Sequence, residues 1–489
     1  MLDRTKELAV GSFKWSFLAY TVPRIVQPLS VLALAWLLTP ADYGIVGMST
    51  TILSLAMLFQ DLGLSRAVMH YQERVDEIAN IAFWANTLLS TVMAFVVISS
   101  AHIIGAFYKE PRLVDVLRVQ SIGLILTSLY LVQETLLRKA FRFKQLFARS
   151  LVPVVSSFVI AIPLAALGFG YWALIVASLV SGVIHVLLLW TASSWRPSLS
   201  VDWRLTRSTL GFGGMAMVEI LQAWLINIGD RIVIGYYLGA IVLGQYVFAD
   251  SLMTTVFSLT GIGMSVAFPA FCALQRDRLG LAEVYLEVVQ SIAVLAIPAG
   301  LGLAVLAFPL VNILLGPQWQ PLQPLIVLLG IYGITSVGSP NSGLFTAVGR
   351  PDIIPKIHTG LILYLIPTYL IGVQFGVVGF TVAKISQVTF LIVQTIVVGR
   401  VLNLRRLFLW DLCRKPLFAG LVMTGSVWLV AVALNAGRGP NLGNLLKLAL
   451  MLLVGATVYG GALYLLDGNL VRKNMRRIVR AFAPGLEGA

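Results

Sequence analysis

Apolar stretches of about twenty residues recur along almost the whole of this chain, and they constrain its fold more than any other feature. A membrane-spanning helix needs about 20 consecutive apolar residues, and the stretches here are separated by short segments of glycine, proline and charged residues. Only 11% of the 489 residues are charged, whereas a soluble domain carries about 25%. The sequence therefore predicts an all-α integral membrane protein.

Fourteen of these stretches are predicted to span the membrane. The first ends in Ala33-Leu34-Ala35, a pattern typical of signal-peptide cleavage sites, but its apolar run is too long for a signal peptide and carries Pro23 and Arg24. It is therefore interpreted as a retained span. The expected spans are 12–38, 43–64, 79–105, 113–137, 148–169, 171–194, 209–238, 241–271, 285–315, 322–348, 353–374, 377–399, 416–435 and 443–466.

The basic residues orient these helices. With the N-terminus in the cytoplasm, 27 of the 35 lysines and arginines fall in cytoplasmic segments, five fall on the opposite side, and three lie within spans. Such an asymmetry follows the positive-inside rule, so both termini are expected to be cytoplasmic. The lysines and arginines that give the net charge of +14 are then expected to form a basic girdle at the cytoplasmic surface, facing membrane lipids. No nucleic-acid partner is expected.

The connections between spans are too short to hold a soluble domain on either side. The outward ones include 39–42, 169–170, 239–240 and 375–376. No G-x-x-x-x-G-K-[ST] motif is present, and no nucleophile, base and orienting acid come together. Cys272 and Cys413 show no metal-binding or disulfide pattern, and the histidines, such as His185, are read as packing residues. The sequence predicts a protein that is not an enzyme and has no cofactor.

An internal repeat relates the two halves of the chain. At an offset of 200 residues Leu38 corresponds to Leu238 and Gly44 to Gly244, and at an offset of 208 Gly168 corresponds to Gly376. Helices 1–6 and 7–12 are therefore expected to be parallel repeats, with substrate bound between them. The predicted domains are a six-helix bundle over 1–194, a cytoplasmic linker over 195–208, a second six-helix bundle over 209–402, and two extra helices with a basic tail over 403–489.

The stretch Leu37–Met48, "LLTPADYGIVGM", is interpreted as a tight hairpin between the first two spans. Thr39 can cap the second helix, and Pro40 suits its first turn, where no backbone donor is needed. Asp42 lies where the positive helix end favours an acid, and Gly44 is expected to let the two helices of the hairpin approach closely.

Two charged residues are predicted to lie near the membrane midplane. Arg24 in the first span and Glu219 in the seventh are each about 15–18 Å from the cytoplasmic end of their helix, at 1.5 Å per residue. Because these helices are equivalent in the repeat, both side chains are expected in the cleft between the bundles. A buried arginine there suits an anionic head group, and a structural pair with Glu219 is the alternative.

Four further charged residues are predicted at a common depth in the second half of the chain. Asp230, Arg231, Asp250 and Lys384 each lie about 10–14 Å from the outer end of their span. Ionisable groups inside a membrane are costly unless paired or hydrated. Structural pairing of Asp230 or Asp250 with Lys384 is one interpretation, and coupling of transport to a cation or proton through Asp230 and Asp250 is the other.

Several segments resemble the polysaccharide transporter family, the oligosaccharide and O-antigen flippases of the multidrug/oligosaccharidyl-lipid/polysaccharide exporter superfamily. The resemblance extends from the first span to about Arg350. It is carried by "LLTPADYGIVGM" (37–48), "DLGLSRAV" (61–68), "LLRKAFRFKQLFARS" (136–150), "GFGYWALIVASL" (168–179), "NIGDRIVIGYYLGAIVLGQYVFA" (227–249) and "AFPAFCALQRD" (267–277).

This resemblance implies a bacterial inner-membrane flippase that moves an undecaprenyl-pyrophosphate-linked oligosaccharide repeat unit to the outer leaflet by alternating access. The expected partners are that lipid-linked oligosaccharide, membrane lipids and the polymerase or export machinery of polysaccharide synthesis. Arg24, Arg231 and Lys384 are the residues that the resemblance suggests for a cationic cleft. A peptidoglycan-precursor flippase and a cation-coupled multidrug antiporter of the same superfamily are the alternatives.

Overall fold

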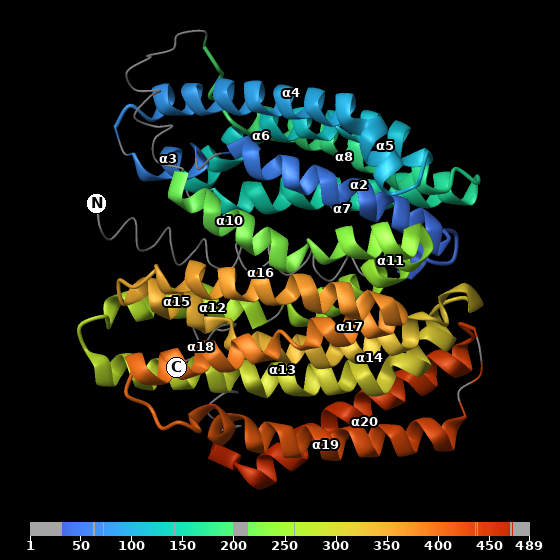
Figure 1. Ribbon diagram of the computed structural model, residues 1–489, viewed down its shortest axis with the longest axis vertical. Helices are drawn as coiled ribbons and strands as arrows, with labels where there is room; N and C mark the ends of the chain where they lie inside the picture. Colours follow the sequence, from blue (N-terminus) through green and yellow to red (C-terminus); the bar gives the residue numbers. More distant parts are fainter. Residues whose placement is uncertain are drawn as a thin grey trace, which may run out of the picture. The chain divides into compact units, whose positions relative to one another are not determined.

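The structure, a computed structural model, describes residues 32–469 together with residue 472, except for 62, 63, 72, 141, 199–213, 259, 436 and 438. Over these residues the regular structure is helical, with short 3-10 turns and loops between the helices (Figure 1). Within the described residues, eleven stretches are long and apolar enough to cross a membrane. The predicted all-α membrane fold is therefore confirmed. Of the predicted first span, 12–38, only 32–38 lie within the described residues.

Two of the eleven stretches are each long enough to cross a bilayer twice. Met217–Phe257 contains 41 residues and Ile353–Val401 contains 49, whereas one crossing takes about 20. Each is interrupted by a glycine in a backbone conformation that other residues rarely adopt, Gly239 with φ 80° and Gly376 with φ 70°. Both glycines lie at turns that the sequence predicts, 239–240 and 375–376.

The described chain divides into two compact units at Phe248 and Ala249. In unit 1, α4 packs on α6, and α7 packs on α8. The helices of unit 1 are α2 (Pro40–Asp61), α3 (Leu64–His70), α4 (Val75–Phe107), α5 (Arg112–Gln120), α6 (Ile122–Lys139), α7 (Phe143–Ala166), α8 (Tyr171–Ala192), α10 (Gly214–Asn227) and α11 (Asp230–Phe257) as far as Phe248.

A buried cluster joins α3, α4 and α6 at the end of unit 1 that is predicted to be cytoplasmic. It includes Val68 of α3, Phe83 of α4 and Val132 of α6. Lys139, the last residue of α6, donates hydrogen bonds to the carbonyls of Val68 and Tyr71, where α3 ends. A cation at a helix C-terminus satisfies unpaired carbonyls and the helix dipole together. Lys139 therefore fixes the end of α3 while it stays in the predicted basic girdle.

The hairpin stretch Leu37–Met48 forms a capping box at the start of α2. The Thr39 hydroxyl accepts from the Asp42 backbone N–H at 3.3 Å, and the Asp42 carboxylate accepts from the Thr39 N–H at 2.8 Å. The other Asp42 oxygen accepts from the Tyr171 N–H at 3.0 Å, in the first turn of α8. Thr39 as cap and Asp42 in the first turn are confirmed, and Asp42 also ties α2 to α8.

Two glycines make a reciprocal close contact between α2 and α11 within unit 1. A Cβ on Gly44 would lie 1.8 Å from the Ala240 carbonyl oxygen, and a Cβ on Gly244 would lie 1.8 Å from the Pro40 carbonyl oxygen. At the offset of 200 residues, Pro40 corresponds to Ala240 and Gly44 to Gly244. The contact therefore has the form that two-fold-related surfaces make, in which residue i meets j and j meets i. Gly44 is predicted to let the first two spans approach each other; most of the first span lies outside the described residues, and the close contact that the structure shows is with α11.

Unit 2 is built around the long helix α13, which packs against α14 and α19. A Cβ on Gly300 of α13 would lie 2.5 Å from the Gly330 carbonyl oxygen of α14, so these helices are also in backbone contact. The helices of unit 2 after α11 are α12 (Thr260–Ala273), α13 (Arg278–Leu314), α14 (Leu322–Gly333), α15 (Pro340–Ala347), α16 (Ile353–Gly372), α17 (Gly376–Ile385), α18 (Val388–Val401), α19 (Phe408–Leu434) and α20 (Leu442–Leu466).

The last two helices, α19 and α20, form a hairpin that packs on α13 (Figure 1). Their shared cluster comprises Leu306 and Ile313 of α13 with Met423, Val427, Leu448 and Met451. At one end of the hairpin Lys415 and Asp467 form an ion pair at 2.8 Å. The C-terminal helix pair is thus bound to unit 2 by an apolar seam.

The two compact units do not have the same boundary as the two predicted six-helix bundles. The predicted boundary near 209 comes from the repeat, whereas unit 1 continues to Phe248. The continuation has a physical cause, because α10 and the first part of α11 are held against α2. The Trp224 indole donates to Ser54 at 2.9 Å, and Gly244 contacts Pro40. The domain bounds at 194, 208 and 402 remain predictions.

Candidate substrate pocket and buried charges

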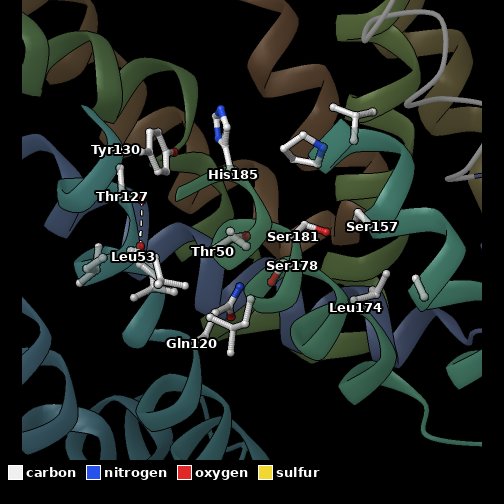
Figure 2. A pocket seen from close by; sticks show the side chains of 18 of the residues that line it. Thr50, Leu53, Gln120, Thr127, Tyr130, Ser157, Leu174, Ser178, Ser181 and His185 are labelled. Carbon is white, nitrogen blue, oxygen red and sulfur yellow. Dashed lines mark hydrogen bonds between the residues drawn. The ribbon is translucent and has the colours of Figure 1, made fainter. Parts of the chain in front are cut away.

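A pocket of about 590 Å³ opens between α2, α6, α7 and α8 in unit 1 (Figure 2). Its walls combine apolar side chains with hydroxyl, amide and imidazole groups. None of the described residues that line it is an aspartate, glutamate, lysine or arginine. The polar lining residues are Thr50, Gln120, Thr127, Tyr130, Ser157, Ser178, Ser181 and His185.

Two helices contribute most of these polar groups because their spacing follows the helix period. Ser178, Ser181 and His185 recur at intervals of three and four residues along α8, so they share one face. Thr127 and Tyr130 do the same on α6. The Tyr130 and His185 rings lie 4.4 Å apart between centroids, with an angle of 37° between their planes. Figure 2 shows this pair together at one end of the pocket.

The hydroxyl protons of the pocket are largely engaged by backbone carbonyls. Thr127 donates to the Gly123 carbonyl at 2.8 Å, Ser178 to Ile175 at 2.8 Å, and Thr50 to Gly47 at 3.1 Å. A hydroxyl has one proton and two acceptor lone pairs. Each of these oxygens therefore still offers an acceptor site to a ligand.

Unit 2 holds a buried ion pair between two helices. Lys384 of α17 and Asp250 of α11 lie 3.6 Å apart, Nζ to Oδ1, with 3% and 6% of their side-chain surfaces exposed. Two charges that are removed from solvent persist only when they compensate one another. Of the two carboxylates predicted as partners of Lys384, the structure thus places Asp250 beside it.

Neutral polar groups extend this ion pair into a network. The Lys384 ammonium lies 5.2 Å from the centre of the Tyr332 ring on α14, a cation–π contact. The Tyr332 hydroxyl donates to Gln387 at 2.9 Å, and the Gln387 amide donates to Tyr369 at 2.8 Å. Gln387 lies in the turn between α17 and α18. Four helices of unit 2 therefore meet at one polar layer inside the apolar region.

The other predicted site residues lie in different surroundings. Asp230, the first residue of α11, is buried and accepts a hydrogen bond from the hydroxyl of Tyr246, which lies in the same helix beyond Gly239. Arg231 beside it is half-buried, and Glu219 on α10 is exposed. Arg24 lies outside the described residues. Among the residues predicted to lie at a common depth, Lys384 thus pairs with Asp250, and Asp230 is hydrogen-bonded by Tyr246.

Sequence reasoning did not identify the pocket of unit 1. The sequence-based site prediction relied on charged residues within the spans, whereas the described lining of the pocket is neutral. The signal was nevertheless present as helical polar stripes, Ser178–Ser181–His185 and Thr127–Tyr130, in spans that are otherwise apolar. His185, which was read as a packing residue, lies on the pocket wall. Within the described part of the chain, no three His, Cys, Asp or Glu side chains group together to hold a metal.

The comparisons with known proteins agree with this architecture. A family model described as polysaccharide biosynthesis protein matches residues 33–324, which is more than half of the chain, so the chain belongs to this family. The teichuronic acid biosynthesis protein TuaB of Bacillus subtilis (strain 168) is 25% identical, over 79% of this chain and 82% of its own. The lipopolysaccharide biosynthesis protein WzxC of Escherichia coli (strain K12) is 25% identical, over 80% and 79%.

Solved structures show the same fold. A lipid II flippase MurJ in an inward closed conformation matches with a TM-score of 0.70 at 13% identity, covering 94% of this chain and 99% of its own. An inward-facing multidrug resistance MATE transporter matches with a TM-score of 0.59 at 17% identity, covering 81% and 96%. The resemblance to the polysaccharide transporter family is confirmed, and the chain is a multi-pass protein of the bacterial inner membrane.

Proposed function

We propose that this protein is a flippase that moves an undecaprenyl-pyrophosphate-linked oligosaccharide repeat unit across the bacterial inner membrane for the synthesis of lipopolysaccharide, capsule or exopolysaccharide. The observation that carries the proposal is membership of the polysaccharide biosynthesis family over residues 33–324, on the fold of a lipid flippase. The pocket of unit 1 adds a chemical argument, since its neutral hydrogen-bonding groups suit a sugar inside an otherwise apolar region.

The proposed architecture has fourteen crossings in two parallel six-helix repeats with two appended helices and both termini in the cytoplasm. If the two long stretches count twice each, the eleven stretches supply thirteen crossings, and the predicted span 12–38 supplies one more. The reciprocal contact of Gly44 and Gly244 supports the repeat, because it is the contact that two-fold-related hairpins would make. Transport would then proceed by alternating access between the repeats.

The charged residues are proposed to serve the head group and the energy source. Arg24 is the candidate for binding pyrophosphate, with Glu219, Arg231 and Lys384 as further candidates for the cleft. Asp230 and Asp250 are the candidates for cation coupling. The pairing of Asp250 with Lys384 gives this proposal a concrete form, because protonation of Asp250 or displacement of Lys384 by a cation would break the pair and bias the surrounding helices.

For Arg24, the anion-site proposal makes a graded prediction. Substitution by lysine keeps the charge but loses bidentate geometry, whereas substitution by glutamine loses the charge. Transport should fall in both variants, and further for Arg24→Gln. The rate of lipid-linked oligosaccharide translocation, measured at matched protein levels, provides the comparison. Normal transport by Arg24→Gln would remove Arg24 from the site.

Deletion of the gene in its host tests the function as a whole. Surface or exported polysaccharide should be lost while lipid-linked repeat units accumulate at the inner leaflet, and the wild-type gene should restore export. Unchanged polysaccharide with altered drug sensitivity would instead support a cation-coupled multidrug antiporter. Lethality with arrested cell-wall synthesis would support a peptidoglycan-precursor flippase. Partnership with the polymerase or export machinery would appear as co-purification from the restored strain.

A further inference from the structure

The pocket of unit 1 is equipped to accept hydrogen bonds rather than to bind anions. Thr50, Thr127 and Ser178 have their hydroxyl protons directed at backbone carbonyls, so each oxygen can still accept a hydrogen bond from a ligand, although Thr127 also shares a hydrogen bond with the Tyr130 hydroxyl. Ser181 shares a hydrogen bond with Ser156 at 3.1 Å. A ligand with many O–H donors finds partners here. A carboxylate or phosphate, which only accepts hydrogen bonds, meets mainly oxygen atoms and, among the described lining residues, no lysine or arginine.

Charged groups flank the pocket along two of its helices without lining it: Arg149 of α7 donates to the Leu188 carbonyl of α8 at 3.0 Å, and a glutamate and an arginine lie on α6. Glu134 lies one turn beyond Tyr130 on α6, and it is held by Arg138 on the next turn at 2.5 Å. The pair is neutral as a whole, so it provides no net attraction for an anion. At the other end, the Gln120 side-chain oxygen accepts from the Ser49 hydroxyl at 2.6 Å, which leaves only a neutral amide as donor.

Two aromatic rings complete the recognition surface. Tyr130 and His185 present ring faces inclined to each other by 37°, with one polar atom at the Tyr130 tip and polar nitrogens on the His185 ring. A pyranose ring has apolar C–H faces and hydroxyls around its edge. It can therefore pack a face on these rings while its hydroxyls donate to Thr127 and Ser178.

We propose that the pocket of unit 1 is a subsite for an uncharged sugar of the repeat unit and discriminates against acidic sugars. The assignment rests on the proposed function in one respect, namely that the bound sugar belongs to the transported molecule. The sugar and the pyrophosphate then bind at different places, because the pyrophosphate requires cationic residues elsewhere. The repeat unit carried by this protein should accordingly present a neutral hexose to unit 1.

The test uses the full-length protein in lipid nanodiscs, with methyl β-D-glucopyranoside and methyl β-D-glucuronide as probes. These differ only by a carboxylate in place of a hydroxymethyl group. Saturation-transfer NMR with competition titrations should show saturable binding of the glucoside, and at least about tenfold weaker binding of the glucuronide. Empty nanodiscs provide the blank. Equal or tighter binding of the glucuronide, or no saturable binding of the glucoside, would overturn the proposal.

Substitutions locate the binding in this pocket. Thr127→Val and Ser178→Ala each remove one acceptor and should weaken glucoside binding about fivefold, the effect of one neutral hydrogen bond. The matched control is Thr91→Val, because Thr91 makes the same backbone hydrogen bond at 2.8 Å but is exposed on α4. Thr127→Lys should reverse the preference toward glucuronide. If this last variant does not fold, the double variant Thr127→Val/Ser178→Ala still decides, and undiminished glucoside binding by it refutes the assignment.

Failure of the subsite and failure of the function give different results. If the protein translocates lipid-linked oligosaccharide while the pocket variants bind and transport like wild type, the subsite is wrong and the flippase stands. If the wild-type protein binds the glucoside as described but translocates no lipid-linked oligosaccharide, the subsite stands and the flippase is wrong.

Discussion

Glycine 44 shows how a single missing side chain can decide a helix contact. The space beside it is filled by the Ala240 carbonyl, and Gly244 faces the Pro40 carbonyl in the same way. Backbones approach this closely in membranes only where small residues face one another. The contact therefore depends on both glycines, and the sequence offset of 200 residues brings them into equivalent positions.

A substitution of this glycine should separate α2 from α11. In Gly44→Ala the new methyl group overlaps a backbone oxygen, which cannot rotate away, so we expect a loss of about 1–3 kcal/mol. Thermal unfolding of the detergent-solubilised protein measures the loss. The control is Gly425→Ala in α19, where a Cβ meets open space and stability should be equal or slightly higher. Equal melting of both variants would contradict the backbone contact.

Substitutions of Lys384 and Asp250 can separate a structural role of their ion pair from a role in coupling transport to a cation. Removal of one partner leaves an uncompensated buried charge, so Asp250→Leu or Lys384→Met alone should cost about 3–5 kcal/mol. The double variant Asp250→Leu/Lys384→Met should recover most of that stability. Melting temperatures and transport are then compared across the cycle.

The outcome in the double variant distinguishes the two interpretations of the pair. A stable double variant that no longer transports supports the proposed coupling role of Asp250. A stable double variant with wild-type transport would show that the pair is structural. Additive losses in the two single variants, with no recovery in the double variant, would mean that the two side chains do not act as a pair.

At the scale of elements, hydropathy predicted where helices lie but not where they bend. The predicted span 322–348 is α14, a 3-10 turn over Ile334–Gly338, and α15. The interruption fits Pro340, which removes a backbone donor and conflicts with the preceding turn. The predicted span 377–399 instead breaks at Ser386 and Gln387, without a proline. There the Gln387 side chain bonds to Tyr332 and Tyr369, residues that are distant in sequence, so a local pattern carried no sign of it.

The candidate site shows the same division. The number of residues to the end of each span predicts a common depth for Asp230, Asp250 and Lys384, and this common depth stays a prediction. The partner of Lys384 could not be predicted, because it depends on how each helix is rotated about its axis. The spacing of Ser178, Ser181 and His185 indicates a polar helix face, but a prediction based on charged residues alone does not include it.

The helix pair α19–α20 is expected to depend on packing rather than on the hydrophobic effect, because lipid is as apolar as the helix interface. Met451 is fully buried between α20, α19 and α13. Its replacement by alanine leaves a cavity, and we expect a loss of about 1–3 kcal/mol, below the range for water-soluble cores. The control is Leu453→Ala, at a side chain that is 61% exposed on the membrane surface of α20.

Thermal unfolding in detergent compares these two variants. Met451→Ala should melt at a lower temperature than wild type, and Leu453→Ala should melt close to it. An unchanged melting temperature for Met451→Ala would show that the cluster over α13, α19 and α20 contributes little to the attachment of the C-terminal helix pair.

At the scale of the whole molecule, the proposed function gives the fold and the two polar regions different parts of one substrate to bind. The chain belongs to the polysaccharide biosynthesis family, and its membrane helices carry a neutral pocket in unit 1 and a charged layer in unit 2. A lipid-linked oligosaccharide combines neutral sugars, an anionic pyrophosphate and an apolar tail. A neutral pocket, cationic residues and lipid-facing helices are the surfaces that such a molecule requires.

Translocation by the purified protein tests the central claim most directly. Proteoliposomes would receive a fluorescently labelled undecaprenyl-pyrophosphate-linked oligosaccharide from the host, and the fraction of label accessible to a membrane-impermeant quencher would be followed over time. The account predicts that label moves between leaflets with this protein and stays in place in protein-free vesicles. A folded protein that leaves the label in its original leaflet, with or without a proton or sodium gradient, would contradict it.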